Sequence, residues 1–104
     1  MQQQNNNNNK AQRWCVYILQ CSDNSLYTGI TVEPQRRVEE HNRDDKLAAR
    51  YTRGRRPVTL VYQEYCSSRA TAASREAAIK KLSRMQKLAL IAQSPSPTVD
   101  VAYD

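Results

Sequence analysis

Two short apolar segments joined by a polar turn constrain the fold of this chain more than any other feature. Residues 14–20 and 26–30 have the length and composition of strands, and the Ser, Asp and Asn residues of Cys21–Ser25 are typical of a tight turn. The sequence therefore predicts a β-hairpin whose side chains alternate between two faces. Gly29 indicates a point where backbone or ligand approaches closely. Along the first strand, one face carries Trp14, Val16 and Ile18, and the other carries Cys15, Tyr17 and Leu19.

The chain after the hairpin is predicted to begin with a helix. Pro34 suits the first turn of a helix, which we expect to run to about Asn42. Residues 43–57 are polar and basic, and they predict a loop with one helical turn near Lys46–Arg50. Residues 58–65 are rich in Val, Leu and Tyr and predict a third strand.

Two more helices are predicted after the third strand. Ser68 is a candidate N-cap for a helix over residues 69–81. Ser83, with Gln86 three residues later, forms a capping box for a last helix that ends near Ala92. The order β-β-α-β-α-α predicts an α+β fold, in which a small three-stranded antiparallel sheet is flanked by three helices.

Composition divides the chain into one domain and two tails. The first nine of its 104 residues are almost all Gln and Asn, which cannot bury apolar surface, so residues 1–12 are expected to be a disordered tail. Residues 13–92 are expected to form the single folded domain. Residues 93–104, which alternate Ser and Pro near their start, are expected to be a flexible tail.

Charge indicates the partners of this domain, and cysteine content indicates its compartment. The net charge is +6, and residues 36–56 hold seven arginines and one lysine against four acids, which indicates DNA or another nucleic acid as partner. A basic protein that binds nothing is the alternative. No apolar run is long enough to cross a membrane, so no membrane partner is expected. Three cysteines without CxxC spacing are typical of reduced thiols in a cytoplasmic protein.

Four side chains are candidates for a phosphate-handling site. Arg37 and His41 are spaced i,i+4, which places them on one face of the predicted helix. Tyr17 and Tyr27 lie on neighbouring predicted strands. An arginine can offset phosphate charge, a histidine can shuttle a proton, and a tyrosinate is a competent general base. The ordinary alternatives are a solvated arginine, a helix-terminal histidine and packed strand tyrosines.

Glu76 is the carboxylate that most needs a partner. It lies three or four positions from Ala72, Ala73 and Ile79, which mark the packing side of its predicted helix. An isolated carboxylate is costly to bury there. An ion pair with a nearby Arg or Lys is one solution. The other is a single Mg²⁺ whose remaining ligands are waters and a phosphate oxygen.

A basic segment with an aromatic ring predicts contacts with nucleic acid. In residues 50–56 a tyrosine alternates with arginines, which suits contact with the phosphate backbone and stacking on an unpaired base. A flexible, solvated loop is the alternative. The candidate contact residues are Arg36, Arg50, Tyr51, Arg53, Arg55, Arg56 and Lys80.

Four short segments match a known pattern in order and spacing. They are Val16-Tyr17-Ile18-Leu19, Leu26-Tyr27-Thr28-Gly29, the run from Arg37 to His41, and Arg75-Glu76. Together they resemble the GIY-YIG nuclease family, and most closely its small single-domain bacterial members. These members also have a loop like Tyr51–Gly54. The likeness extends over essentially the whole folded part.

The resemblance implies hydrolysis of a DNA phosphodiester with one divalent cation, Mg²⁺ or Mn²⁺. It implies that Tyr17 or Tyr27 takes the proton of the attacking water, with Tyr17 the favoured base. It further implies that Arg37 stabilises charge in the transition state and that His41 assists it. Glu76 matches the metal ligand of the family.

Two hypotheses about function follow from these residues. The leading one is a metal-dependent DNA endonuclease, with single-stranded or branched DNA as candidate substrates. Single-domain family members lack the DNA-targeting modules of larger relatives, which leaves a targeting role for a protein partner. The alternative is a nucleic-acid-binding module of the same fold that is catalytically weak or inactive.

Overall fold

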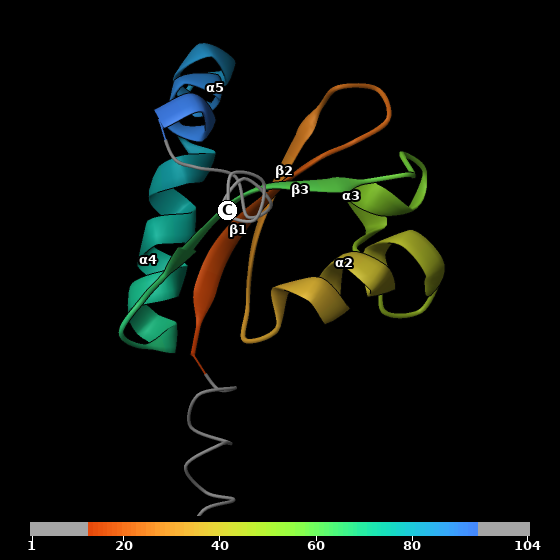
Figure 1. The fold of residues 1–104 in the computed structure, drawn as a ribbon, viewed down its shortest axis with the longest axis horizontal. Helices are drawn as coiled ribbons and strands as arrows, with labels where there is room; N and C mark the ends of the chain where they lie inside the picture. Colours follow the sequence, from red (N-terminus) through yellow and green to blue (C-terminus); the bar gives the residue numbers. More distant parts are fainter. Residues whose placement is uncertain (1–12, 94–104) are drawn as a thin grey trace, which may run out of the picture.

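A three-stranded antiparallel sheet lies at the centre of the computed structural model, which describes residues 13–93 (Figure 1). Its strands are β1 (Cys15–Gln20), β2 (Leu26–Thr31) and β3 (Thr59–Tyr65), and they lie side by side in the order β2-β1-β3. Both pairings of β1 are antiparallel. The predicted hairpin, the third strand and the α+β class are therefore confirmed.

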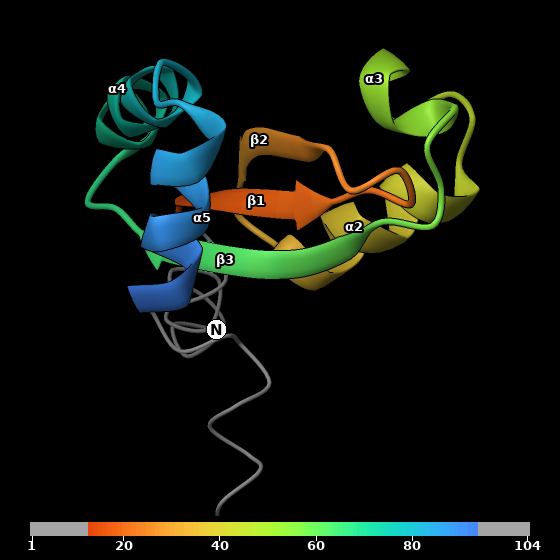
Figure 2. The ribbon, with the colours of Figure 1, turned by 90° about the horizontal axis from the view of Figure 1, so that it is seen from above.

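Two pairs of helices cover the sheet from opposite sides (Figure 1, Figure 2). Helices α4 (Arg69–Lys80) and α5 (Arg84–Gln93) lie on one side, and α2 (Pro34–Arg43) and α3 (Arg50–Arg53) lie on the other. Within residues 13–93 this makes four helices, so the prediction of three was wrong by one short helix. None of the helices described is long and apolar enough to cross a membrane.

The additional helix is α3, where the sequence predicted only a turn near Lys46–Arg50. Asp44 Oδ1 accepts hydrogen bonds from the backbone N–H groups of Lys46, at 2.9 Å, and Leu47, at 3.0 Å. Those bonds close a side-chain turn, which competes with helix formation at these residues. The helix starts only after this turn, at Arg50.

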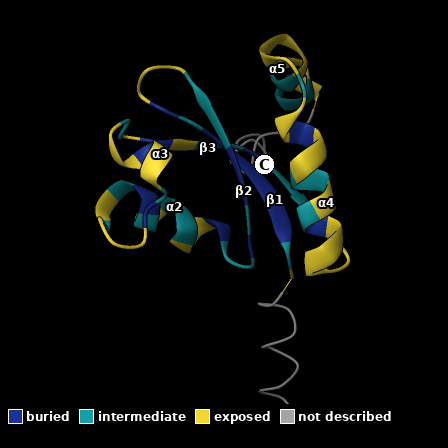
Figure 3. Ribbon diagram, turned by 180° about the vertical axis from the view of Figure 1, so that it is seen from behind, coloured by how far each residue is buried: buried dark blue, intermediate teal, exposed yellow. Residues whose placement is uncertain are grey.

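The alternation along β1 separates two hydrophobic cores, and β1 is the most completely buried strand (Figure 3). The core on the side of α4 consists of Val16, Ile18, Tyr62, Ala72 and Ile79. The core on the side of α2 consists of Tyr17, Leu19, Cys21 and Val58, with Val38 of α2 packed against it. We call these sides the α4 face and the α2 face. The two sets of β1 residues are those that the sequence assigned to opposite faces.

A β-bulge in β3 adjusts the sheet to these two cores. Ile18 pairs with Tyr62 whereas Leu19 pairs with Leu60, so Val61 is an extra residue on β3. Val61 and Tyr62 therefore both pack against the core of the α4 face, and Leu60 packs against the core of the α2 face.

The predicted helix caps are present. The Ser68 side chain accepts a hydrogen bond from the backbone N–H of Thr71 at 3.1 Å. Ser83 and Gln86 exchange two bonds between side chain and backbone, at 2.9 and 3.1 Å, which is the predicted capping box. Helix α5 runs to Gln93, the residue at which a tail was expected to begin. The other residues of the predicted tails lie outside the described part of the chain.

Candidate active site

Three polar side chains are fully buried on the α2 face. Tyr17 of β1 is 1% exposed, and His41 of α2 and Thr52 of α3 are 0% exposed. Polar groups are tolerated inside a protein only where they are hydrogen-bonded, because burial removes their bonds to water. Each of these three side chains is bonded to another, so polar contacts tie β1, α2 and α3 together.

The bonds form a continuous chain. The hydroxyl oxygen of Tyr17 lies 2.9 Å from His41 Nε2, and His41 Nδ1 lies 2.8 Å from the hydroxyl oxygen of Thr52. The Thr52 hydroxyl in turn donates to the carbonyl oxygen of Ala49 at 3.0 Å. One imidazole thus connects a phenol on the sheet with the backbone that precedes α3.

A glycine makes room for the phenol of Tyr17. Gly29 is its cross-strand partner, and a Cβ on Gly29 would lie 2.7 Å from the Tyr17 hydroxyl oxygen and 2.8 Å from its Cζ. Those separations are too short for non-bonded atoms, so the ring fills the space that any other side chain would need. The sequence predicted a close approach of backbone or ligand at Gly29; the group that approaches is instead the side chain of Tyr17.

Tyr27 is the partly exposed phenol of the cluster. Its ring meets the His41 ring edge-on, with 5.2 Å between centroids, and stacks on the Tyr51 ring with 6.0 Å between centroids. Tyr51 is 39% exposed, and the Arg55 guanidinium lies 3.9 Å from its ring centroid. Solvent therefore reaches Tyr27, whereas Tyr17 lies beneath the surface.

Arg37 supplies a positive charge beside the buried phenol. Its side chain is 25% exposed. Arg37 Nη1 donates to a carboxylate oxygen of Glu40 at 2.9 Å and to the carbonyl oxygen of Leu47 at 2.7 Å. The guanidinium also lowers the pKa of Tyr17 by charge and hydrogen bonding, although this effect is smaller than that of burial.

Burial keeps the Tyr17–His41 pair uncharged. Burial first, and then the charge of Arg37, lowers the pKa of His41 from 6.5 to about 4. Burial first, and then Tyr27, raises the pKa of Tyr17 above its ordinary value. Near neutral pH the pair is therefore a neutral phenol and a neutral imidazole. One imidazole nitrogen is then free to accept a proton.

The residues of this arrangement lie within a segment that matches a known family. The GIY-YIG catalytic domain, by its family description, matches residues 13–89, which include β1, β2 and all helices that carry the candidate residues. The chain belongs to the GIY-YIG family. A nuclease-type catalytic domain with a nucleic acid substrate is the functional class that this family supports.

Relatives of this GIY-YIG protein carry the name UPF0213. A UPF0213 protein of Desulfotalea psychrophila is 56% identical over 81 residues, which are 78% of this chain and 73% of the relative. A UPF0213 protein of Halobacterium salinarum is 55% identical over 75 residues, which are 72% of this chain and 95% of the relative. These names state a protein family and no activity.

Two solved structures share the fold of this GIY-YIG protein. The solution structure of a UPF0213 protein from Bacillus halodurans has 37% sequence identity and a TM-score of 0.54, and it covers 86% of this chain and 94% of that chain. A solution structure from E. faecalis has 38% identity and a TM-score of 0.51, and it covers 75% of this chain and 82% of that chain.

GIY-YIG nucleases generally use divalent metal ions, and Glu76 is the candidate ligand here. Its side chain is 22% exposed, and one carboxylate oxygen lies 3.2 Å from Lys80 Nζ, which is the ion pair that the sequence allowed as an alternative. Within residues 13–93 no group of three or more His, Cys, Asp or Glu could hold a metal. The donor set therefore fits a hydrated ion held by one carboxylate and does not fit a cage of protein ligands.

The five predicted catalytic residues occupy two faces of the sheet. Tyr17, Tyr27, Arg37 and His41 meet on the α2 face. Glu76 lies on α4, and no hydrogen bond, ion pair or ring contact of the described residues joins it to the other four. Helix α4 packs against β2, the edge strand that carries Tyr27. Strand β2 is therefore the element that connects both parts of the candidate site.

The candidate nucleic-acid contact residues differ in whether their side chains already bind other residues of the protein. Arg50 and Arg53 are exposed and take part in none of the ion pairs of the described residues. Arg55 is paired with Asp23 at 3.1 Å. Arg56 donates to the carbonyl oxygen of His41 at 2.6 Å and is one-quarter exposed, so it holds α2 in place.

The other two candidate cations carry ion pairs of their own. Arg36, whose side chain is 64% exposed, lies 3.6 Å from Glu33 and 3.5 Å from Glu40. Lys80 pairs with Glu76 on α4. Both cations are reachable from solvent, but a phosphate would have to compete with a carboxylate for each of them.

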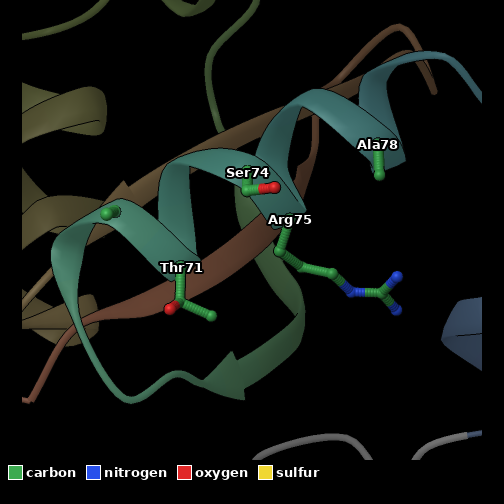
Figure 4. A pocket seen from close by; sticks show the side chains of 5 residues that line it. Thr71, Ser74, Arg75 and Ala78 are labelled. Atoms are coloured by element: carbon green, nitrogen blue, oxygen red, sulfur yellow. The ribbon is translucent and has the colours of Figure 1, made fainter.

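Sequence reasoning missed Thr52. Nothing in its position marks it as a partner of His41, which is 11 residues away. In the structure Thr52 is buried between exposed Tyr51 and Arg53, and no local sequence pattern signals this. A shallow hollow on α4 lies apart from the candidate residues; Figure 4 shows Thr71, Ser74 and Arg75 along it.

Proposed function

We propose that this GIY-YIG protein is a divalent-metal-dependent DNA endonuclease that hydrolyses phosphodiester bonds, with single-stranded or branched DNA as its substrate. The observation that carries the proposal is the hydrogen bond between the buried Tyr17 hydroxyl and neutral His41, beside the cation of Arg37. The Tyr17 hydroxyl is costly to bury, and it adds little to packing that a phenylalanine ring at this position would not provide. Perturbed titratable groups packed together are typical of catalytic sites.

Tyr17 acts as the general base, and His41 makes this possible. A phenol whose pKa is raised cannot release its proton to water near neutral pH. Tyr17 can accept the proton of an attacking water while it passes its own proton to His41 Nε2, 2.9 Å away. Tyr17 is buried, and its partly exposed neighbours Tyr27 and Arg37 are the side chains through which solvent comes nearest to it. Tyr27 orients the water or the phosphate, and it is the alternative base.

Arg37 neutralises charge on the phosphate in the transition state. A guanidinium matches two phosphate oxygens with parallel hydrogen bonds. Its present partners are Glu40 and the Leu47 carbonyl, and its side chain is reachable from solvent. Both contacts use Nη1, so the N–H groups of Nε and Nη2 are further donors for a phosphate.

Glu76 is the residue that would hold the divalent cation. A cation bound there supplies charge neutralisation at the phosphate. The half-buried carboxylate and the contact of α4 with β2 support this role. Exposed Arg50 and Arg53 on α3 support a path for the nucleic acid over the α2 face, close to Tyr51 and Tyr27.

The alternative function is a nucleic-acid-binding module without turnover. Two observations favour it: the burial of Tyr17 and the ion pair between Glu76 and Lys80. This alternative keeps the basic surface and requires no proton transfer. It therefore predicts salt-sensitive DNA binding with no cleavage under any metal condition.

A cleavage assay separates the two functions. End-labelled single-stranded, branched and duplex DNA are incubated with the protein and Mg²⁺ or Mn²⁺, with EDTA as the metal-free arm. The nuclease predicts cleavage of single-stranded or branched DNA that EDTA abolishes and Glu76→Gln removes. Glu39→Gln is the matched control, because Glu39 also forms an i,i+4 ion pair on a helix, with Arg43 at 3.9 Å. DNA binding without cleavage in both metals would contradict the proposal.

A further inference from the structure

His41 is the only histidine in the chain, and its role depends on which ring nitrogen carries the proton. If Nδ1 carries it, Nε2 has a lone pair and accepts a proton from Tyr17. If Nε2 carries it, His41 donates to the Tyr17 oxygen and cannot take the phenolic proton. The two forms therefore give opposite directions of proton transfer along the same 2.9 Å contact.

The surroundings of Nδ1 decide between these forms. The Thr52 hydroxyl oxygen lies 2.8 Å from His41 Nδ1 and 3.0 Å from the Ala49 carbonyl oxygen. A hydroxyl has one proton, and a carbonyl oxygen can only accept. Two oxygens 3.0 Å apart need that proton between them. The Thr52 proton therefore points to Ala49, and the contact with Nδ1 must be bridged by a proton on Nδ1.

A competing contact favours the other form. The backbone N–H of Ala49 lies 3.4 Å from His41 Nδ1, and it could donate only to an unprotonated Nδ1. This contact is longer than the 2.8 Å contact with Thr52, and hydrogen bonds weaken with distance. The shorter contact with Thr52 therefore prevails in the wild-type protein, and the Ala49 N–H becomes the partner of Nδ1 only if the hydroxyl is removed.

We propose that Thr52 is a positioning residue that fixes the Nδ1–H tautomer of His41, so that Nε2 stays available to accept the proton of Tyr17. The inference rests on the proposed function for its catalytic meaning, since Thr52 is fully buried and acts only through His41. In the reaction step, an O–H bond of the attacking water breaks and its proton bonds to the Tyr17 oxygen, while the old phenolic O–H bond breaks and that proton binds Nε2. The hydroxide so formed bonds to phosphorus, and the P–O bond to the leaving oxygen breaks. The phenol ends neutral and His41 ends as the imidazolium.

Burial explains why the tautomer needs a dedicated partner. All three side chains are at most 1% exposed, so water does not compete for these bonds. Thr52 is not accessible to solvent, and among residues 13–93 its hydroxyl has two partners, His41 Nδ1 and the Ala49 carbonyl oxygen. The residue thus acts through His41, in the manner in which a residue behind a catalytic histidine orients it.

Nitrogen NMR of histidine-labelled full-length protein near neutral pH tests this inference. A single histidine gives one set of ring signals, and a protonated ring nitrogen resonates well upfield of an unprotonated one. We expect Nδ1 to be protonated and Nε2 to be bare in the wild-type protein. Thr52→Val keeps the shape of the side chain and removes the hydroxyl. We expect it to move the imidazole proton from Nδ1 to Nε2, and the backbone N–H of Ala49 then donates to the unprotonated Nδ1.

Thr52→Ser is the control, because it removes the methyl group and keeps the hydroxyl. It should retain the wild-type ring signals, whereas a purely structural role of Thr52 would leave the ring signals of both variants unchanged. A protonated Nε2 in the wild type, or unchanged ring signals in folded Thr52→Val, would overturn the inference.

The NMR measurement needs no DNA, so the tautomer is decided even if the protein cuts nothing. Where cleavage is present, Thr52→Val should lower its rate by roughly tenfold or more, because a correctly protonated base contributes about that much or more. Thr52→Ser should stay within about threefold of wild type. Equal rates for wild type and Thr52→Val would contradict the catalytic meaning of the tautomer.

Discussion

The two faces of the sheet bury side chains of different kinds. On the α4 face the fully buried side chains Val16, Ile18 and Ile79 are apolar, and the hydroxyl of buried Tyr62 bonds to the partly exposed carboxylate of Glu64. The α2 face buries the hydroxyls of Tyr17 and Thr52 with the imidazole of His41 at the same depth. Apolar packing is enough to stabilise a small sheet, so the polar chain on the α2 face requires another explanation. A catalytic role supplies one, because proton transfer needs dry, directed hydrogen bonds.

The largest expected loss of stability comes from the α4 face. Ile79→Ala removes a fully buried side chain from the centre of that core. We expect the free energy of unfolding to fall by about 2–5 kcal/mol, as is usual for such truncations. Chemical denaturation followed by circular dichroism measures it. A loss below about 1 kcal/mol would mean that the α4 face is not the stabilising side.

On the α2 face, His41 makes stability depend on pH. Its pKa is lowered from 6.5 to about 4 in the folded protein, so the unfolded chain binds the proton more readily. Its full stabilisation is present above pH 6.5 and is lost as the pH falls towards 4, by about 3 kcal/mol in total. Denaturation of wild type and His41→Gln over this range measures the difference, and the variant should have the flatter profile. Parallel profiles would contradict the burial of a neutral His41.

The two glycines of the chain give a matched pair of substitutions. A Cβ at Gly29 would lie 2.7 Å from the Tyr17 hydroxyl oxygen, whereas nothing lies within 4 Å of one at Gly54. Gly29→Ala should lower the free energy of unfolding by about 1–3 kcal/mol through overpacking, and it should reduce cleavage by displacing the phenol. Gly54→Ala should change stability by less than about 0.5 kcal/mol. Equal melting temperatures for the two variants would show that Tyr17 does not lie over Gly29.

The smallest effect on stability is expected at Glu76. A partly exposed i,i+4 ion pair contributes about 0.2–0.5 kcal/mol, so Glu76→Gln and Glu39→Gln should unfold at nearly the same denaturant concentration. Only Glu76→Gln should lose cleavage and weaken the binding of Mn²⁺, measured by calorimetry. If both variants bind Mn²⁺ as the wild type does, the role of Glu76 is limited to its ion pair with Lys80, and it is not a metal ligand.

Features that depend on nearby residues could be predicted from the sequence. Alternation along β1 assigned Tyr17 and Ile18 to opposite faces, and the caps at Ser68 and Ser83 involve residues three positions apart. The meeting of Arg37 and His41 on one face required only helical spacing. The fold class follows from the same short-range patterns.

Features that depend on contacts between distant segments could not be predicted. Thr52 finds His41 only because α3 folds back on α2, and α3 begins only after the Asp44 turn ends. The bulge that turns Val61 to the α4 face depends on how β1 and β3 pair. The burial of Tyr17, which decides how it can act as a base, likewise appears only in three dimensions.

The most direct test of the account compares the same substitution on the two faces. Tyr17 and Tyr62 are both buried, at 1% and 4% exposure, and each hydroxyl is hydrogen-bonded to a side chain, that of Tyr17 to His41 and that of Tyr62 to Glu64. Single-turnover cleavage of labelled single-stranded or branched DNA with Mn²⁺ is measured for wild type, Tyr17→Phe and Tyr62→Phe at matched folded fractions. The account predicts a rate about 100-fold lower for Tyr17→Phe and a nearly unchanged rate for Tyr62→Phe. Equal rates for the two variants would contradict it.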